Sequence, residues 1–203
     1  MSTVATIRDR LLETPWIYRL WQSPFADAKL QPFLQGVASQ PPRRVLDVGC
    51  GPGTNAAAFA KAEYVGIDIN AEYIATAQQR FGGRFIVGDL RDPRVLPDER
   101  FDCVLANSLM HHLPDNVVDA LLARMAQLTS SGGRTHLLDL VLPSGRSAAR
   151  MLARMDRGDF PRPVDEWTRR FSAHFRIAHH EVYPLGLPGV PLWWMIYLVG
   201  EPL

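Results

Sequence analysis

The spacing of apolar residues changes near residue 43, and the chain divides there into two kinds of sequence. Upstream, apolar side chains recur at i, i+3, i+4 and i+7, which predicts one face of a helix; they are Leu30, Phe33, Leu34 and Val37. The Pro41–Pro42 pair ends this helical segment. Downstream, short apolar runs alternate with longer stretches of helical spacing.

The downstream region predicts strands and helices in alternation. Strand-like runs cover residues 45–48, 64–69, 85–87, 101–106 and 135–142, and helical segments cover 54–62, 71–81 and 115–128. The Gly132–Gly133 pair is expected to end the last of these helices. Strands that alternate with helices are joined by crossovers and pair in parallel, which predicts an open α/β sheet.

The end of the chain follows a different pattern. Two strand-like runs, 175–183 and 192–199, are joined by a loop rich in proline and glycine, with no helix between them. This predicts a hairpin at one edge of the sheet. Trp193 and Trp194 are adjacent on the second run, so their side chains should point to opposite faces. One is expected in the core, and the other either meets a partner chain or covers the sheet edge.

Length and composition restrict the class of protein. The 203 residues suit a single domain, 1–203, and 47% hydrophobic and 21% charged residues are typical of a globular chain. A formal net charge of +1 gives no reason to expect a nucleic-acid or membrane-surface partner. The two cysteines, Cys50 and Cys103, lie far apart in apolar runs, which favours neither a disulfide framework nor a metal site.

The sequence also gives an expectation about location. The N-terminus, MSTVATIRDR, lacks the apolar stretch of a signal peptide. The longest apolar run is 192–199, whereas a membrane helix needs about 20 apolar residues. We therefore expect a cytoplasmic protein.

A glycine-rich turn follows the first strand of the predicted sheet. Residues 45–53 read VLDVGCGPG, so a buried strand runs into a turn. Glycine lets the backbone bend sharply and lets a ligand approach it closely. Asp68 ends the next strand, where a carboxylate is placed to accept hydrogen bonds from both hydroxyls of a ribose. Together these features describe an adenosine-binding crevice at the carboxyl ends of the strands.

The spacing of the glycines separates two kinds of adenosine cofactor. A dinucleotide site needs G-x-G-x-x-G or A, and Thr54 occupies the last of these places. The glycines here are Gly49, Gly51 and Gly53, and Pro52 removes one backbone donor from the turn. The turn is therefore less suited to a pyrophosphate.

At this point the chain resembles the class I methyltransferases that depend on S-adenosylmethionine (SAM). VLDVGCGPG is similar to the family's first motif, and the resemblance continues with Asp68 in VGIDIN, Asp89 in VGDL, the run FDCVLANSLMHHLP and the turn SSGGR. The match covers roughly residues 43–142, in the family's order and spacing. It implies SAM as cofactor and a Rossmann-like, doubly wound sheet of about seven strands, mostly parallel with a C-terminal antiparallel hairpin.

The resemblance implies a set of cofactor-binding residues: Asp47, Gly49, Gly51, Gly53, Asp68, Ile69, Asp89, Leu90 and Asn107. The first two glycines of the turn should lie against the methionine and ribose portions of SAM. Asp47 should help hold the methionine amino group, directly or through water, and Asp68 should bind the ribose. Asn107 should present its backbone carbonyl to the methionine end.

The adenine ring has its own expected partners. Ile69 should pack on the ring, and Asp89 should accept a hydrogen bond from its amino group with Leu90 beside it. The alternative interpretation is that Asp68, Asp89 and Asn107 merely cap turns or helices.

Two histidines are candidates for catalysis. Methyl transfer from a sulfonium is an in-line displacement, so the nucleophile must be aligned about 3 Å from the methyl group. A base is needed only where the nucleophile must lose a proton. His111 and His112 follow the fourth strand beside the cofactor, and histidine titrates near neutral pH. Alternatively, they only cap the following helix or shape the pocket.

The N-terminal residues 1–42 are a candidate helical lid. In the family, helices before the first motif often cover the SAM pocket. By that resemblance Tyr18, Trp21 and Gln22 would form the lid and face the methyl group, where they would also meet the acceptor. The alternative is that this aromatic stripe belongs to the core.

A second candidate acceptor lid is the stretch 143–170. Its helical spacing puts Ala148, Met151, Leu152 and Met155 on one face, with Arg146, Arg150 and Arg154 on the other. A looser similarity to uncharacterised small methyltransferases with a DRG element here implies that Asp156 and Arg157 line the acceptor pocket. The alternative is a solvated helix face followed by a structural turn at Gly158.

The resulting hypothesis is a SAM-dependent methyltransferase, monomeric or homodimeric, that acts on a small aromatic, polyketide-like or lipid-like acceptor. Three alternatives remain: a SAM-fold protein that catalyses another reaction or binds SAM without turnover, a nicotinamide-dependent dehydrogenase, and a non-enzymatic interaction module that uses the Trp193–Trp194 edge.

Overall fold

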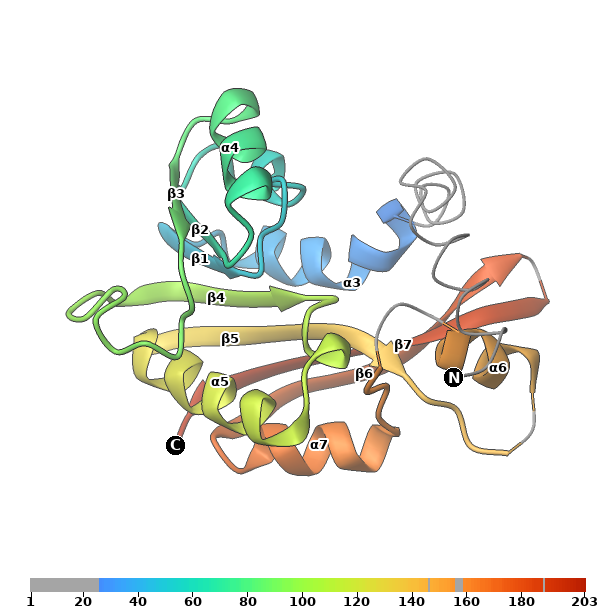
Figure 1. The fold of residues 1–203 in the computed structure, drawn as a ribbon. Helices are drawn as coiled ribbons and strands as arrows, with labels where there is room; N and C mark the ends of the chain where they lie inside the picture. Colours follow the sequence, from blue (N-terminus) through green and yellow to red (C-terminus); the bar gives the residue numbers. More distant parts are fainter. Residues whose placement is uncertain (1–25, 146, 156–158, 188) are drawn as a thin grey trace, which may run out of the picture.

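The computed structural model describes residues 26–145, 147–155, 159–187 and 189–203 (Figure 1). The strands are β1 (Arg44–Val48), β2 (Glu63–Asp68), β3 (Arg84–Val87), β4 (Phe101–Asn107), β5 (Thr129–Val141), β6 (Phe175–Leu187) and β7 (Val190–Pro202). The helices are α3 (Ala26–Ser39), α4 (Ala71–Arg80), α5 (Asp115–Leu128), α6 (Ala148–Met155) and α7 (Val164–Ser172), with 3₁₀ turns η2 (Ala56–Phe59) and η3 (Met110–His112).

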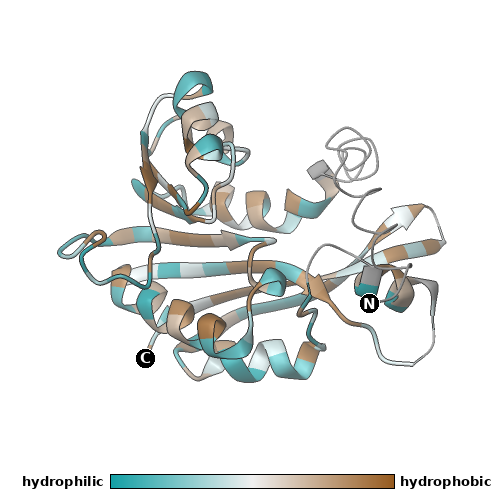
Figure 2. Ribbon diagram, in the orientation of Figure 1, coloured by the Kyte–Doolittle hydropathy of each residue, from teal (hydrophilic) through white to brown (hydrophobic). Residues whose placement is uncertain are grey.

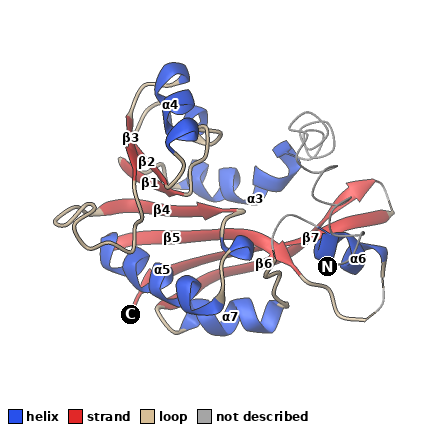
Figure 3. Cartoon of the chain, viewed as in Figure 1, coloured by secondary structure: helices blue, strands red, loops and turns tan. Residues whose placement is uncertain are grey.

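The seven strands form one sheet in the order β3-β2-β1-β4-β5-β7-β6 (Figure 3). The first five pair in parallel, and β7 runs antiparallel to both β5 and β6. The predicted α/β sheet with a C-terminal antiparallel hairpin is therefore confirmed. The direction of winding reverses between β1 and β4, and ligands of such sheets bind at the carboxyl ends of the strands beside this reversal.

Helices cover both faces of the sheet (Figure 1). On one face α3 and α4 pack on the sheet through a cluster that includes Phe33 and Ile74. On the other face α5 and α7 bury a larger cluster that includes Leu122 and Trp167. In Figure 2 brown, apolar positions lie along the central strands, and the helices found as α3 and α5 in Figure 1 carry both brown and teal positions. This alternation is the amphipathic pattern that the sequence predicts.

Helix α3 confirms the predicted N-terminal helical face only in part. Phe33 is buried edge-on against His136 and Tyr197 of the sheet, with ring centroids 5.3 and 6.4 Å away. Leu34, expected on the same face, is exposed. Burial lowers the pKa of His136 to about 3, so this histidine is a neutral core residue at physiological pH.

The segment after the glycine turn is shorter and tighter than predicted. The prediction of a helix over 54–62 is wrong. This segment forms the 3₁₀ turn η2, with hydrogen bonds between residues three apart. In a 3₁₀ turn, side chains three apart eclipse, which puts Ala56 and Phe59 together in the core. The Asn55 side chain is tied to buried Asp47, which holds the start of the segment against the sheet.

The sequence predicts that the Gly132–Gly133 pair ends helix α5 before the next strand, and this prediction is wrong. The helix ends at Leu128, and β5 begins at the next residue. The glycines instead lie in a β-bulge, where residues 130–133 stand opposite the single Asp102 of β4. Gly132 has φ +77°, and Gly133 packs directly on the backbone of β4.

Helix α6, in the stretch predicted as an acceptor lid, also packs differently from its predicted apolar face. Ala149 and Ala153 are buried, whereas Met151 is 59% exposed. The helix lies against Trp193 in a small cluster at the end of the sheet, and small side chains allow that close approach. Trp194 packs with the α5 and α7 cluster, so the two tryptophans lie on opposite faces as predicted.

Two further properties bear on the class of protein. Within the described ranges, none of the helices has the length and apolarity needed to cross a bilayer. Cys50 and Cys103 are both buried free thiols. Burial raises the pKa of each thiol far above its ordinary value, so neither is suited to act as a nucleophile at neutral pH.

The bulge gives a test of the fold. A Cβ at residue 133 would lie 2.9 Å from the Phe101 carbonyl oxygen and 3.0 Å from that of Asp102, both backbone atoms that cannot move aside. We expect Gly133→Ala to lower the free energy of unfolding by about 1–3 kcal/mol through overpacking, measured by urea denaturation.

The matched control is Gly82→Ala. No atom lies within 4 Å of a Cβ built there, so this change should be neutral or stabilise the protein by up to about 1 kcal/mol. Equal midpoints for the two variants would show that the bulge does not constrain the sheet.

Candidate cofactor and catalytic site

The glycine turn after β1 adopts a conformation that favours glycine at three positions. Gly49, Gly51 and Gly53 have φ of +69°, +54° and +79°. A Cβ on Gly49 or Gly53 would strike the side chains of Leu109 and Phe81, within 3 Å in each case. A Cβ on Gly51 would meet nothing within 4 Å. The middle glycine therefore faces open space, as a backbone approached by a ligand must.

Asp68 connects the ends of β1 and β2. Its carboxylate accepts hydrogen bonds from the backbone N–H of Gly51 at 3.0 Å and of Asn70 at 2.8 Å. Asp68 therefore caps the turn, which was the alternative to ribose binding, and its carboxylate lies beside Gly51. The next residue, Ile69, is 75% exposed, which is unusual for a large aliphatic side chain beside a sheet.

Asp47 is buried beneath the turn. Its Oδ2 accepts hydrogen bonds from Asn55 Nδ2 at 3.0 Å and from the Tyr64 hydroxyl at 2.5 Å. Its Oδ1 is also buried and has no hydrogen-bond partner among the described residues. Burial raises the pKa of Asp47 to about 6, against the hydrogen bonds from Tyr64 and Asn55, which lower it.

The end of β4 adds a polar group on the other side of β1. Asn107 Nδ2 donates to Asn55 Oδ1 at 3.2 Å, which links β4 to the Asp47 network. Ser108 follows with φ +53°, a conformation uncommon outside glycine, and its hydroxyl accepts a hydrogen bond from Lys29 of α3 at 3.1 Å. The carboxyl end of β4 is thus fixed both to the β1 turn and to the N-terminal helix.

The Asp89 position lies after β3. Its carboxylate accepts from the backbone and guanidinium of Arg91, and these hydrogen bonds hold the pKa of Asp89 below its ordinary value. Asp89 is therefore an ionised acceptor, again in a turn-capping geometry. The side chain of Leu90 is buried in the core, so only its backbone is placed to meet a ligand.

The two histidines follow β4 in the 3₁₀ turn η3, and they differ in environment. His111 is 3% exposed, and its Nδ1 lies 2.6 Å from Oδ1 of Asp139. His112 is exposed, and its ring centroid is 4.0 Å from that of His111. His111 is therefore held by a buried carboxylate.

Asp139 is buried in β5, and its carboxylate makes three hydrogen-bond contacts within the part of the chain that the structure describes. Besides His111, it accepts from the backbone N–H of Met110 and of Leu140. Burial alone would raise its pKa, but the interactions with His111 and these two N–H groups outweigh burial and lower it. An ionised Asp139 places the proton of a neutral His111 on Nδ1 and leaves Nε2 as the basic nitrogen.

Sequence reasoning did not identify four residues of this site: Lys29, Asn55, Tyr64 and Asp139. The sequence carries a signal for Asp139 alone, since an acid within the apolar run LLDLV must find a partner when the strand is buried. The other three are ordinary polar residues whose partners come from other elements.

Several predicted acceptor residues lie outside the described residues: Tyr18, Trp21, Gln22, Asp156 and Arg157. Their roles stay predictions. Among the residues that the structure describes, no group of three His, Cys, Asp or Glu side chains is arranged to hold a metal ion.

Comparison with known proteins agrees with this geometry. Residues 45–133 match the family model described as a methyltransferase domain. An uncharacterised methyltransferase of Mycobacterium tuberculosis is 37% identical over 108 residues, which make up 51% of this chain and 53% of that protein. A ubiquinone biosynthesis O-methyltransferase of Rhodopseudomonas palustris is 38% identical over 95 residues, 44% of this chain and 37% of that protein. The chain spans about half the length, or less, of these curated relatives.

The fold has solved counterparts. Magnesium protoporphyrin IX methyltransferase from Synechocystis, determined with bound SAH, superposes with a TM-score of 0.68 at 18% identity, over 87% of this chain and 83% of that one. The strand order, the glycine turn and the matched residues lead to one assignment. Residues 45–133 are similar to methyltransferase domains, and the chain has the fold of known SAM-dependent methyltransferases.

Proposed function

We propose that the protein binds SAM at the carboxyl ends of β1, β2 and β4 and transfers its methyl group to a small-molecule acceptor. The observation that carries this proposal is the turn at Gly51, which faces open space and is bordered by the carboxylates of Asp68 and Asp47. Bound SAM would supply an electrophilic methyl group on a sulfonium.

The residues present fit such a cofactor. The buried Oδ1 of Asp47 lacks a partner among the described residues, and a buried carboxylate oxygen needs a donor, such as an ammonium or a water that bridges to it. Asp68 would bind the ribose hydroxyls, and Asn107 would offer its backbone carbonyl to the methionine end. Exposed Ile69 would cover the adenine ring, with Asp89 at its amino group.

We further propose that His111 is the base for an acceptor that must lose a proton, such as a hydroxyl or an ammonium. Asp139 orients the ring through Nδ1, so the acceptor proton would pass to Nε2. This arrangement suits methylation at oxygen, the reaction named for the Rhodopseudomonas relative. The proposal further includes a small acceptor and lids over the pocket from residues 1–42 and 143–170. It also includes a cytoplasmic location and a monomeric or homodimeric state.

Incubation with methyl-labelled SAM and panels of phenolic, enolic and fatty hydroxy compounds tests the reaction. Transfer of the labelled methyl group from SAM to one of these compounds supports the proposal. Stoichiometric SAM binding without transfer to any compound would favour a SAM-fold protein with another reaction. NADH binding without SAM binding would contradict the proposal that SAM is the cofactor.

The first prediction concerns the ribose contact. Asp68→Ala should weaken SAM binding at least tenfold, because it removes a carboxylate that also orders the Gly51 turn. Asp92→Ala is the control, since that acid pairs with Arg94 in a neighbouring turn. Calorimetric titration with SAM measures both, and equal affinities would contradict the proposed site.

The second prediction concerns pH. Because the pKa of Asp47 is about 6 in the free protein, SAM affinity should fall below about pH 6, approaching tenfold per pH unit. An ammonium beside Asp47 favours the ionised form, so binding releases a proton in this range. The binding enthalpy, measured by calorimetry in buffers of different ionisation enthalpy, reports that proton, and Asp47→Asn should flatten the pH dependence of the affinity.

Stability of the free protein should show the opposite trend. A raised carboxyl pKa means that the native state binds more protons than the unfolded chain between about pH 4 and pH 6. The Asp47 contribution to unfolding free energy therefore falls as pH rises through that window. Comparing wild type with Asp47→Asn isolates this contribution, and curves of identical shape would show that Asp47 does not titrate there.

The third prediction concerns catalysis. His111→Gln should lower kcat about 10²-fold or more while SAM affinity stays within about twofold, because a general base contributes to the transition state. His180→Gln, an exposed histidine of β6, is the control. The pH profile of kcat/KM should lose its acidic limb only in the His111 variant, and an unchanged limb there would exclude His111 as the base.

A further inference from the structure

We propose that Arg162 is a positioning residue that fixes the His111–His112 turn against the end of β5. The inference rests on the proposed function, because it gives the proposed base a rigid support. Arg162 is a charged side chain only 2% exposed, and burial of a guanidinium is costly unless every donor is used.

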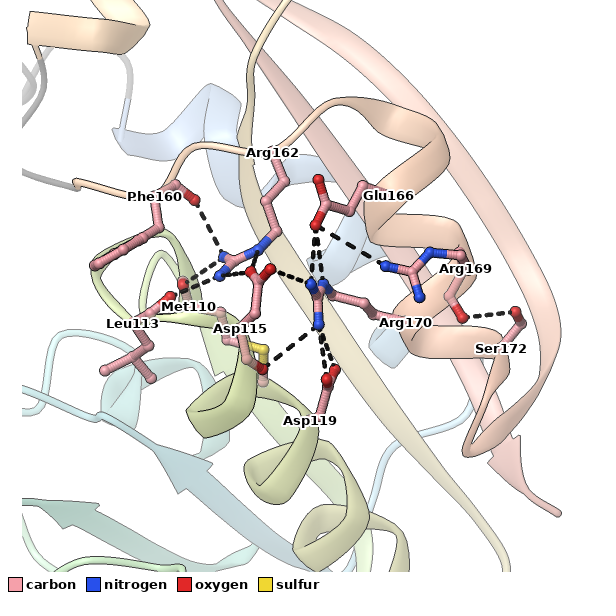
Figure 4. Close-up of polar contacts among 10 residues, drawn as sticks. All are labelled: Met110, Leu113, Asp115, Asp119, Phe160, Arg162, Glu166, Arg169, Arg170 and Ser172. Atoms are coloured by element: carbon pink, nitrogen blue, oxygen red, sulfur yellow. Dashed lines mark hydrogen bonds and ion pairs between the residues drawn. The ribbon is translucent and has the colours of Figure 1, made fainter.

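The guanidinium spans the histidine turn from one end to the other (Figure 4). Its Nη1 donates to the carbonyl of Met110 at 3.0 Å, and its Nη2 donates to the carbonyl of Leu113 at 2.7 Å. The two histidines lie between these carbonyls in sequence. A planar group with five N–H donors can make both contacts at once, whereas the single ammonium of lysine is a point donor.

The same guanidinium is held from its other sides. Its Nε and Nη2 bind Oδ1 of Asp115, at 2.9 and 2.7 Å, in the first turn of α5. Its carbon atom lies 4.9 Å from the centre of the Trp167 ring, whose Nε1 donates to the Leu140 carbonyl. The plane of the group is therefore fixed by an acid and by an aromatic ring of α7.

The backbone around Arg162 joins the turn to β5. The Phe160 N–H donates to the carbonyl of His111 at 2.9 Å. The Leu142 N–H donates to the carbonyl of Arg162 at 2.8 Å, and residue 162 forms a bridge with Val141. Asp139 lies two residues earlier on that strand. The segment thus connects the backbone that carries the imidazole with the backbone that carries its carboxylate partner.

A second buried arginine in the same cluster has a different task (Figure 4). Arg170 binds the Asp119 carboxylate at 2.7 Å and Glu166 at 2.9 Å, and it also pairs with Asp115. These partners lie on α5 and α7, so Arg170 joins one helix to the other. The two arginines share an acid, yet it is Arg162 that bonds to the carbonyls of the histidine turn. Arg170 is therefore a matched control for burial and charge.

The experiment compares Arg162→Lys with Arg170→Lys in the full chain. Protein labelled with ¹³C and ¹⁵N at histidine gives imidazole NMR signals, and His111 is assigned by their loss in His111→Gln. We expect Arg162→Lys to shift the His111 signals, to speed exchange of the Nδ1 proton at least tenfold and to change the pH at which the ring titrates. Arg170→Lys should lower the thermal midpoint and leave these signals in place.

Kinetics add a second readout. In Arg162→Lys, kcat should fall at least tenfold while SAM affinity and the acceptor KM stay within about twofold, because the change displaces a base rather than a binding group. Identical His111 signals in wild type and Arg162→Lys would overturn the proposal. Equal shifts in both lysine variants would overturn it as well, because they would reflect general loosening of the cluster.

A milder variant covers the case in which Arg162→Lys does not fold. Trp167→Phe keeps the guanidinium and removes the indole that stacks on it, so smaller shifts in the same direction are expected. Unchanged His111 signals in this variant would count against the proposal. The NMR readout needs no acceptor: shifts without any methyl transfer by wild type would refute the proposed function and leave the positioning role intact.

Discussion

The reversal of strand order between β1 and β4 is the constraint on which the rest of the molecule depends. Parallel strands that wind in opposite directions from this point leave the ends of β1 and β4 uncovered by a crossover helix. The polar groups of the site accumulate there because backbone and side chains at this edge still need partners. The glycine turn, the Asp47 network and the histidine turn are each attached to one of these strand ends.

The parts of the fold that follow from local sequence were predictable. The period of the apolar residues predicted both ends of the helix 115–128 correctly. The run VLDVGCGPG located the turn, because its glycines adopt conformations that other residues avoid. Asp68 followed from its place at a strand end. These predictions needed only neighbours in the chain and the rule that parallel strands end at one edge.

The remaining features depend on contacts between distant segments. Asp139 meets His111 only because β4 and β5 pair, and Arg162 reaches the histidine turn from a segment that follows α6. Alanine-rich residues 54–62 have helical propensity, yet the bond from Asn55 to Asp47 and the burial of Phe59 select a tighter turn. On α6 it is Ala149 and Ala153 that are buried, in or next to the cluster of Trp193, while Met151 is exposed. Local pattern carries no information about such distances.

The bulge in β5 has a consequence for how this chain tolerates changes in length. Helix α5 passes into β5 without a loop, so a residue inserted or deleted in the helix, or in β5 beyond residue 133, has no flexible connection to absorb it. Past the bulge, a slip of one residue would turn every β5 side chain to the opposite face and carry Asp139 away from His111. The unpaired residues 130–133 are the place where an indel changes loop size and leaves the phase of the strand alone. A change in chain length at the bulge would therefore leave Asp139 in contact with His111.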